Sequence, residues 1–493
     1  MSMDAAMEAI TIVWIALPLF LGFVIYLLPP FSRVLAAVVA IASFTYGLWQ
    51  IFSTTPLSLT FVDSFGVTLS IDSLSGYFVL TNAIVTMAVI CYSWTSAKTA
   101  FFFAQVAFLH GSMNAVFICA DFMSLYVALE VIGIAAFLLI VYPRSERTIW
   151  IGLRYLFISN TAMLFYLMGA VQVYRANQSF AFTGIENAPA EAIALIFLGL
   201  LSKGGLFVSG LWLPQTHAES ETAVSALLSG VVVKTGVFPL VRCALLLQDV
   251  TPMVSMLQLF SVATAVLGTS CAIFEKDTKR MLAWSSLSQM GFILVAPAMA
   301  GIYALGHGLA KSALFLTAGN LPSRQFAELR QQPIARSLWL VALIAGLSIC
   351  GFPLLVGFGA KSLALKSLEG GTAIALNIAA VGTAIAFAKF IFLPFSKDLK
   401  SNLSNGFWAA MALLLVALVT TSALSPDTLS SVYTATSIFK ALITVAAGGV
   451  LYTLFYPRLA TERLALPVGP ERLDNIMGAM VLMLLFLFWW IVP

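Results

Sequence analysis

Charged side chains are scarce in this sequence. Lysine, arginine, aspartate and glutamate make up 9% of its 493 residues, whereas ordinary globular proteins carry about 25%. Hydrophobic residues make up 61%, and apolar runs of the roughly 20 residues that cross a bilayer recur almost from end to end. This composition excludes a water-soluble enzyme and leaves no stretch for a separate soluble domain. We therefore expect an all-α polytopic membrane protein with a single membrane domain over residues 1–493.

Signatures of cofactor and metal binding are also missing. The three histidines are dispersed, and the five cysteines lie in apolar runs without the short spacings of disulfide frameworks or metal sites. There is no nucleotide-binding loop or flavin fingerprint. There is also no cluster of acids, bases or metal ligands of the kind that a membrane enzyme acting on lipid needs. We expect no cofactor, no metal and no nucleic-acid partner.

Apolar runs predict between fourteen and sixteen transmembrane helices. The polar, β-prone stretch from Ser53 to Ser73 separates the second run from the third and predicts a small hairpin. Sixteen runs cover approximately residues 9–29, 34–52, 74–95, 100–120, 122–142, 149–174, 191–213, 222–247, 252–274, 281–299, 301–320, 337–366, 371–395, 406–424, 436–456 and 475–492.

Basic residues mark alternate loops between these runs. The opposite loops hold only Arg175 and, near the end of a run, Lys366. Because cytoplasmic loops carry the excess of lysine and arginine, we expect both termini on the non-cytoplasmic side of the cell membrane. The basic loops contain Arg33; Lys98; Arg144 and Arg147; Lys276, Lys279 and Arg280; Arg324, Arg330 and Arg336; Lys397 and Lys400; and Arg458, Arg463 and Arg472.

Two lysines lie deep in apolar sequence within the stretch from Gly199 to Cys243. Lys203 precedes Gly204 and Gly205, which weaken a helix, and Lys234 lies in the next run. A lysine near the centre of a bilayer costs roughly 2.5–3.5 kcal/mol on insertion scales. Such residues beside a helix break indicate an ion path. Glu130 is the one acidic residue placed in the middle of a run.

A carboxylate near a buried lysine can control its proton. Desolvation weakens the hold of the lysine on the proton, and a nearby carboxylate strengthens it. If Glu130 and Lys203 approach and separate, the proton is held and then released towards Lys234. Relays of this kind are typical of proton transporters. The alternative is a static ion pair that fixes helix packing.

Further candidate relay groups follow along the chain. His307 and Lys311 are four residues apart and therefore share a helix face, and histidine titrates near neutral pH. Lys361 follows a second interrupted run with Gly351, Pro353, Gly357 and Gly359, and Lys389 is either a path member or a packing residue. His217 either lines a cytoplasmic entrance or is solvated. Ser285 and Ser288 either join helices by hydrogen bonds or line a water-filled half-channel.

The two interrupted runs occupy matching places. Lys203 is followed by Lys234 after 31 positions, and Lys361 by Lys389 after 28. Interrupted spans at corresponding places in two halves are the sequence pattern of inverted-repeat transporters.

Four segments resemble one known family. EKDTKRMLAWSSLSQMGF is similar to the signature of the antiporter-like subunits shared by respiratory complex I and the Mrp-type multisubunit cation/proton antiporters. WLPQTHAESETAVSALLSGVVVKTGVF, GHGLAKSALFLTAG and LSICGFPLLVGFGAK resemble its other motifs, and the resemblance covers about residues 72–395. It implies two inverted five-helix repeats with helices seven and twelve interrupted. We assign N-terminal helices 1–3 to residues 1–99, the repeats to 100–248 and 249–395, and C-terminal helices to 396–493.

The resemblance also implies roles for individual residues. Glu130, Lys203, Lys234, His307 and Lys361 fall where the motifs place the carboxylate, the two lysines, the histidine and the last lysine of the proton route. The chain has a glycine where many complex I members have a histidine before WLP, and a lysine at the last position, which is glutamate in one complex I type. Both features look more like the D-type subunit of Mrp antiporters, although Val208 replaces the proline typical of that subunit.

Two functions therefore remain as hypotheses. The first is a proton-translocating subunit of a multisubunit antiporter for a monovalent cation, Na⁺ (or K⁺), with other membrane subunits as partners in the lipid bilayer. The alternative is a proton-pumping membrane subunit of a redox complex, either a complex I-type NADH/ferredoxin-quinone oxidoreductase or a membrane hydrogenase. In either case the chain itself is expected to be a transporter subunit and not an enzyme.

Overall fold

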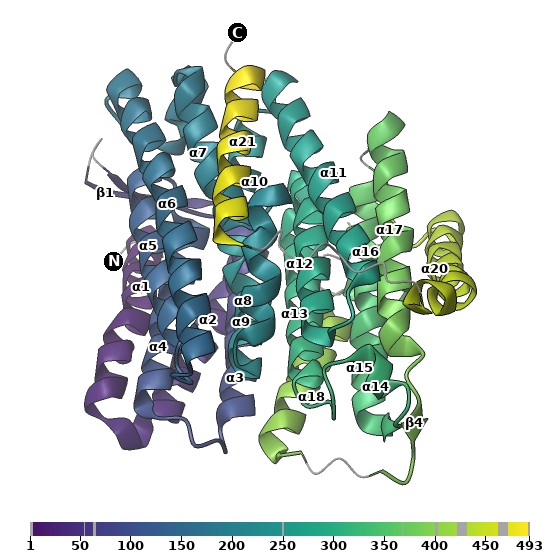
Figure 1. Cartoon of the computed structure of the whole chain (residues 1–493). Coiled ribbons are helices and arrows are strands. Elements are labelled where there is room, and N and C mark those ends of the chain that lie inside the picture. Colours follow the sequence, from purple (N-terminus) through teal and green to yellow (C-terminus); the bar gives the residue numbers. More distant parts are fainter. Residues whose placement is uncertain are drawn as a thin grey trace. The chain divides into compact units, whose positions relative to one another are not determined.

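The computed structural model describes residues 3–53, 55–62, 66–248, 251–366, 368–399, 403–421, 431–461 and 472–491. Within these residues the chain forms two compact units, which are described separately (Figure 1). Unit 1 consists of Met1–Gly204, Val231–Met256 and Met477–Pro493, and unit 2 of Gly205–Gly230 and Leu257–Ile476. The chain passes from one unit to the other at the glycine pair that follows Lys203.

Unit 1 is a helical bundle with one β-hairpin. The predicted hairpin is confirmed: β1 and β2 pair antiparallel with Leu57 opposite Ile71. The Asp121 carboxylate accepts hydrogen bonds from Thr68 N and Ser124 N at 2.8 and 2.7 Å, and so joins the hairpin to the start of α5 (Phe122–Ile140). The elements are α1 (Met3–Leu27), η1 (Pro29–Phe31), α2 (Ser32–Phe52), β1 (Leu57–Val62), β2 (Gly66–Ile71), α3 (Ser73–Ser93), α4 (Ala100–Ile118), α5 (Phe122–Ile140), α6 (Glu146–Asn177), η3 (Phe182–Asn187), α7 (Ala190–Lys203), α10 (Lys234–Leu246) and most of α21 (Leu473–Ile491).

Unit 2 is also helical, and its short strands β3 and β4 pair in parallel. Helix α13 lies at its core, because every one of its residues is buried. The elements are η4 (Phe207–Trp212), α8 (Leu213–Glu219), α9 (Thr222–Leu227), most of α11 (Thr251–Phe274), α12 (Thr278–Leu294), η6 (Pro297–Met299), α13 (Ala300–Ala318), α14 (Phe326–Leu329), β3 (Ile334–Ala335), α15 (Arg336–Cys350), α16 (Val356–Lys366), α17 (Gly370–Ile391), β4 (Phe395–Ser396), α18 (Asn405–Thr420) and α20 (Ala435–Thr461). The π-helical turn η5 (Leu228–Val232) spans the boundary between the two stretches of chain.

Apolar side chains lie on the outside of the helices and several lysines lie inside. Phe20 and Leu27 of α1 are 65% and 75% exposed, whereas Lys234 and Lys311 are 0% exposed. A water-soluble protein has the opposite arrangement. The distribution of apolar and charged side chains therefore fits a chain whose outer surface faces lipid. The helices fit the same setting, because their backbone N–H and C=O groups are hydrogen-bonded within each helix and need no water.

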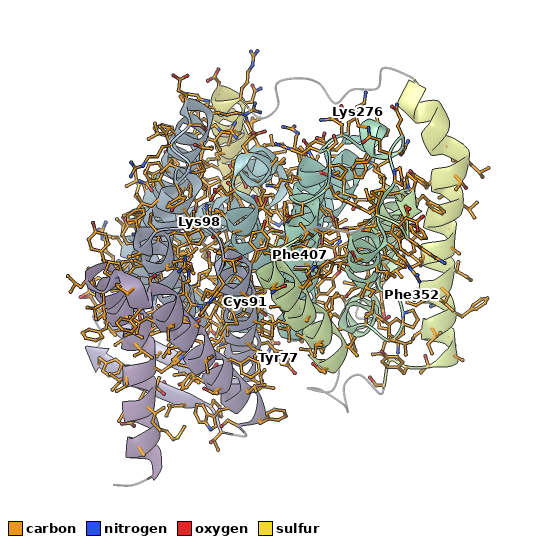
Figure 2. All side chains as sticks on the ribbon, turned by 90° about the horizontal axis from the view of Figure 1, so that it is seen from below. Tyr77, Cys91, Lys98, Lys276, Phe352 and Phe407 are labelled. Carbon is orange, nitrogen blue, oxygen red and sulfur yellow. The ribbon has the colours of Figure 1, made fainter. Side chains whose placement is uncertain are left out.

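Helices are present at all of the expected membrane spans, but α20, the expected fifteenth span, lies across α17 and not alongside it (Figure 1 and Figure 2). Among the described residues, twelve helices are long and apolar enough to cross a membrane; the number is thirteen if α12 and α13, bent by 112° at η6, count as one span. Helices α15 and α18 are shorter but also apolar. Each of the sixteen predicted runs coincides with one helix or a short series of helices. The prediction of an all-α polytopic membrane protein is confirmed.

The predicted interruptions of helices seven and twelve are confirmed. Helix α7 ends at Lys203, after which Gly205 has φ +65° and Phe207 has φ +50°. Helix α15 ends before Gly351, with φ +84°, and α16 begins at Val356. Glycine adopts positive φ without steric cost. The π-helical turn η5 directly before α10 was not predicted, because a single extra residue per turn leaves no mark on apolar periodicity.

Helix α20 runs across unit 2. Figure 1 shows α17 from the side but α20 almost end-on, and Figure 2, turned by 90°, shows α20 lengthwise. It packs on α17, where a Cβ atom on Gly448 would lie 2.9 Å from the carbonyl carbon of Ala384. Phe439, Val450 and Leu454 on α20 are 55–65% exposed. The helix therefore presents apolar side chains away from the unit along its length.

Candidate functional site

Lys203 is held at the broken end of α7. Its ammonium donates hydrogen bonds to the hydroxyl of Ser159 on α6 at 2.6 Å and to the carbonyl oxygen of Leu129 on α5 at 3.0 Å. The side chain is 5% exposed. A Cβ atom on Gly133 would lie 3.3 Å from Nζ, so the missing side chain at Gly133 makes room for the ammonium. Three helices thus form a seat made of neutral acceptors for one buried cation.

Glu130 lies on α5 next to this seat. It is only half-buried, and its charge is close enough to interact electrostatically with Lys203. In the part of the chain that the structure describes, no carboxylate oxygen of Glu130 lies within 4 Å of the Lys203 ammonium. The two residues expected to form a switchable pair are therefore neighbours in an unpaired arrangement.

Lys234 begins α10 directly after the π-helical turn and is 0% exposed. Its segment packs closely on the end of α7. A Cβ atom on Gly236 would lie 2.6 Å from Gly204 Cα and 2.8 Å from Leu200 O. Two glycines therefore let the backbones that carry Lys203 and Lys234 touch.

His307 and Lys311 lie one turn apart on α13, as expected, and both are buried. The Lys311 ammonium donates to Leu282 O on α12 at 2.9 Å and lies 5.1 Å from the ring centroid of Phe387 on α17. An ammonium over an aromatic face is attracted by the ring quadrupole. The lysine thus has a carbonyl and a ring as partners within unit 2.

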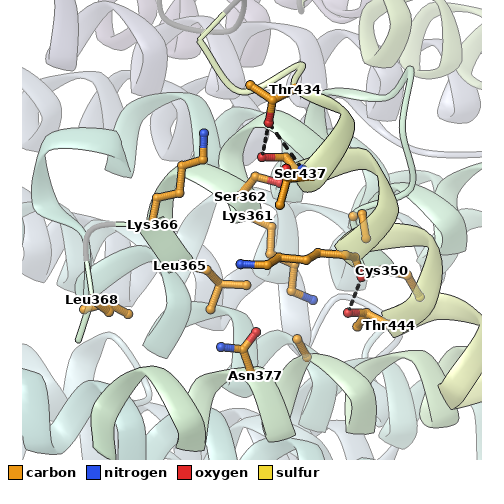
Figure 3. Close-up of a pocket in the computed structure, with 15 residues that line it drawn as sticks. Cys350, Lys361, Ser362, Leu365, Lys366, Leu368, Asn377, Thr434, Ser437 and Thr444 are labelled. Carbon is orange, nitrogen blue, oxygen red and sulfur yellow. Dashed lines mark hydrogen bonds between the residues drawn. The ribbon is translucent and has the colours of Figure 1, made fainter. Parts of the chain in front are cut away.

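Lys361 lies on α16 after the second break. It is 4% exposed, its Nζ lies 3.4 Å from Ile349 O, and it is 4.9 Å from the ring centroid of Phe292. A Cβ atom on Gly351 would approach the Lys361 side chain to 3.2 Å. Its other side lines a cavity of about 390 Å³ that also contains Lys366 and Ser437 (Figure 3).

Lys389 differs from these lysines in where its carbonyl acceptors lie. Its ammonium donates to Ala272 O at 2.9 Å and to Glu275 O at 2.7 Å, at the carboxyl end of α11. The last carbonyls of a helix have no partners inside the helix and carry partial negative charge. Lys389 therefore caps α11, which favours the packing interpretation over membership in the path.

His217 is neither in a loop nor in water. It lies on α8, is 0% exposed, and its ring lies 6.2 Å from that of Trp212 and 5.9 Å from that of Phe315. Ser220, three residues after His217, accepts a hydrogen bond from Lys279 at 3.0 Å, and Arg324 pairs with Asp277 at 2.8 Å. Polar contacts thus hold together the end of unit 2 that carries the basic loops.

The serines of α12 divide into two kinds. Ser288 bonds Thr269 of α11 at 2.7 Å, and Ser286 bonds Ser229 at 2.7 Å, so both join segments within unit 2. The buried Ser285 hydroxyl has no hydrogen-bond partner among the described residues. An unpaired buried hydroxyl costs free energy unless water reaches it, so Ser285 is the serine suited to line a hydrated path.

Several contributors were not singled out from the sequence. Ser159 and Gly133 are part of the Lys203 seat, and Asp72 forms an ion pair with Arg242 at 2.5 Å. Serine and glycine are ordinary in membrane helices, so only the three-dimensional contact with Lys203 distinguishes them. The sequence signal for the ion pair was weak: Arg242 lies near the end of one span, and Asp72 directly precedes another.

The fold and these seats define a class of protein. Broken helices and buried ionisable side chains inside a polytopic bundle are typical of membrane proteins that translocate ions or protons. The chain belongs to the NADH:quinone oxidoreductase/Mrp antiporter transmembrane family, whose sequence profile matches residues 119–386. The resemblance noted from the four motifs is thereby confirmed.

Relatives within this family carry different names. NADH-quinone oxidoreductase subunit N of Desulforudis audaxviator is 28% identical over 68% of this chain and 74% of its own length. Hydrogenase-4 component B of Escherichia coli is 30% identical, with 64% and 53% covered. The D-type subunit of the Na⁺/H⁺ antiporter of Alkalihalophilus pseudofirmus is 26% identical, with 60% and 66% covered. The chain thus spans about half of the hydrogenase component and just under two thirds of the antiporter protein.

Solved structures share the fold at low identity. A chain of the Mrp complex from Dietzia sp. superposes with a TM-score of 0.80 at 22% identity, covering 96% of this chain and 59% of that one. A chain of the archaeal membrane-bound sulfane sulfur reductase gives 0.75 at 20%, with 88% and 99% covered. At these identities the likeness shows a shared fold.

Proposed function

We propose that this chain translocates protons as one subunit of a multisubunit antiporter that exchanges a monovalent cation, Na⁺ (or K⁺), for protons. Each unit contributes one set of relay groups: Glu130, Lys203 and Lys234 in unit 1, and His307, Lys311 and Lys361 in unit 2. We place both termini on the non-cytoplasmic side of the cell membrane, following the distribution of basic loops.

The Lys203 seat is the observation that carries this proposal. Its ammonium rests on Ser159 and Leu129 O, while the Glu130 carboxylate lies nearby without an ion pair. Neutral acceptors stabilise the ammonium less than a carboxylate does. Movement of Nζ between the neutral seat and Glu130 therefore changes how tightly the proton is held. In a static ion pair that fixes helix packing, the lysine would contact the carboxylate directly, and Lys203 does not contact Glu130.

The chain's interrupted helices support the same function. The breaks after Lys203 and before Lys361 release backbone groups from helical hydrogen bonds. Such groups are tolerated at membrane depth where they are buried in protein or line a water-filled cavity. Water at these positions gives protons access to the lysines.

A redox-driven proton pump is the second candidate. Two relatives at 28% and 30% identity are named as parts of a NADH-quinone oxidoreductase and a hydrogenase. In that case the same relay groups move protons, and electron transfer in partner subunits supplies the free energy.

Inverted vesicles carrying the intact native complex distinguish the two candidates. A pH gradient is established, and Na⁺ or K⁺ is added without an electron donor. We expect the cation to dissipate the gradient in wild type and not in Lys203→Ala, while the exposed control Lys276→Ala behaves as wild type. Proton movement that begins only after a reductant is supplied would favour the redox pump. Normal transport in both Lys203→Ala and Glu130→Ala, at equal protein levels, would rule out the relay itself.

A further inference from the structure

A basic cavity lies between α16, α17 and α20 in unit 2. It has a volume of about 390 Å³, and Figure 3 shows Lys361, Lys366, Asn377 and Ser437 around it. Lys440 of α20 also lines it. Hydroxyl groups of serines and threonines make up much of the remaining wall. No acidic side chain is among the described residues that line the cavity.

Three lysines line this cavity, and Lys366 and Lys440 among them are exposed. Lys361 is 4% exposed among apolar helices, so its ammonium interacts with a nearby charge more strongly than it would in water. Hydrogen bonds to carbonyl oxygens orient Lys361 and Lys366 but do not neutralise them; the acceptors are Ile349 O at 3.4 Å and Ser431 O at 3.1 Å. A ligand with negative charge and several acceptor oxygens would satisfy both the charges and the hydroxyls.

An apolar groove adjoins this cavity along α17. It has a volume of about 560 Å³, runs between α11, α17 and α20, and shares Asn377 with the basic cavity. Ile374 and Ile378 of α17 are 64% and 65% exposed beside it. Leu451 of α20 lies on its other side. A charged chamber that continues into an apolar groove has the polarity of a single lipid molecule.

We propose that these two cavities together bind an anionic phospholipid. Its phosphate occupies the basic cavity between Lys361, Lys366 and Lys440, and an acyl chain lies in the groove along α17. Basic pockets between transmembrane helices on the cytoplasmic side bind anionic lipid headgroups, and we propose the same chemistry for this cavity, although Lys366 places it on the opposite side. The apolar groove favours a lipid over a free phosphate, which would leave the groove unfilled.

This site would connect lipid composition to the second set of relay groups. The Lys361 side chain lines the headgroup cavity on one side and contacts Ile349 O on the other. A phosphate in the cavity places a negative charge next to that lysine. The lipid proposal itself rests on the two cavities and stands whether the complex is an antiporter or a redox pump.

Lipid titration of the purified full-length chain tests the proposal. The chain is delipidated in detergent, and binding of phosphatidylglycerol, phosphatidylcholine and inorganic phosphate is measured by native mass spectrometry. Two variants probe the two cavities. Lys366→Gln with Lys440→Gln removes exposed charges from the basic cavity, and Ser270→Trp fills the groove from an exposed position. The exposed Lys397→Gln, which removes one positive charge away from the cavity, is the control.

Phosphatidylglycerol should bind tightly and phosphatidylcholine weakly. The double variant should weaken phosphatidylglycerol binding about twenty-five-fold, counting a factor of about five for each lysine near an anionic headgroup. Ser270→Trp should also weaken it, and Lys397→Gln should leave it unchanged. Equal binding of the two lipids, or unchanged binding in the double variant, would overturn the proposal. Inorganic phosphate could instead bind as tightly as the lipid, with no effect of Ser270→Trp. That result would identify the ligand as a free anion and would also overturn the lipid proposal.

Discussion

At the scale of single residues, the buried lysines share one chemical feature. The proposed relay lysines Lys203, Lys311 and Lys361 all donate to backbone carbonyl oxygens. A carbonyl oxygen accepts a hydrogen bond from the ammonium, but the carbonyl has no net charge and therefore stabilises the charged form of lysine less than a carboxylate does. Desolvation then leaves the balance between charged and neutral lysine open to nearby groups. This property suits groups that must gain and lose protons.

Ser159 should be required for transport, although it does not titrate. Ser159→Ala removes one of the two hydrogen-bond acceptors in the Lys203 seat, and loss of a hydrogen bond to a charged group costs about 1.5–3 kcal/mol. We expect proton movement in vesicles to fall about tenfold or more, by the same arithmetic. Thr161→Ala is the matched control, because that hydroxyl bonds only its own helix, at Phe157 O. Equal transport in the two variants would contradict the role of the seat.

Lys361 and Lys389 should respond differently to loss of charge. Lys389→Met uncaps the carboxyl end of α11 and should lower stability by about 1 kcal/mol, with a mild effect on transport. Lys361→Met should abolish transport at normal protein level. Thermal unfolding in detergent and vesicle transport, measured on both variants, check this contrast. Milder loss of transport in Lys361→Met would reverse the assignment.

At the scale of elements, the breaks in the helices depend on backbone conformations that few residues adopt. Gly205 has φ +65°, and a Cβ atom there would lie 2.9 Å from the Leu213 side chain. Left-handed conformations cost other residues about 1–2 kcal/mol. Gly205→Ala should therefore lower the melting temperature in detergent. Gly449→Ala, in α20 with nothing within 4 Å, should leave it equal or higher, because alanine favours helix by about 1 kcal/mol.

The Asp72–Arg242 pair fastens α3 to α10 and gives the fold a pH dependence. Burial raises the pKa of Asp72, but hydrogen bonds and charge from Arg242, together with Ser75, outweigh it and hold the pKa below its ordinary value. A carboxyl with a depressed pKa stabilises the folded state above its unfolded pKa, and this stability is lost as pH falls through the folded value. Unfolding of the wild type should therefore become easier in strong acid.

Arg242→Gln provides the comparison for this prediction. The variant should be about 2 kcal/mol less stable at pH 7, since both side chains are less than one third exposed and the pair is bidentate. Its free energy of unfolding should change less with pH below about 4, the ordinary range of an aspartate carboxyl. An identical pH profile in wild type and variant would show that the pair contributes nothing to the acid response.

At the scale of the whole molecule, the orientation in the membrane remains a prediction. Lys276 belongs to a basic loop and is exposed, and Lys366 lies at the opposite type of loop and is also exposed. A cysteine at position 276 in a background without native cysteines should react with impermeant reagents only from the cytoplasmic side. A cysteine at position 366 should react only from the other side. The reverse labelling would invert the proposed topology.

The sequence predicted helices and breaks well because both have local causes. Apolar runs fix the helices, and glycine at Gly205 and Gly351 permits the positive φ that ends them. The seat of Lys203 could not be predicted in the same way. It combines α5, α6 and α7, and Ser159 resembles any small polar residue until the helices are packed. The crossing of α20 over α17 was equally hidden, since an apolar helix across a bundle has the composition of one that spans it.

The contact between Gly204 and Gly236 limits how this protein can diverge over time. A side chain at position 236 would collide with the neighbouring backbone, so a single substitution of Gly236 is not tolerated. Exposed apolar positions such as Phe20 do tolerate single substitutions. Descendants of this sequence can exchange most outer apolar residues for one another without cost. Substitutions at the glycine contact must wait for compensating shifts in two helices at once. Gly204 and Gly236 should therefore stay unchanged while other positions of the sequence vary.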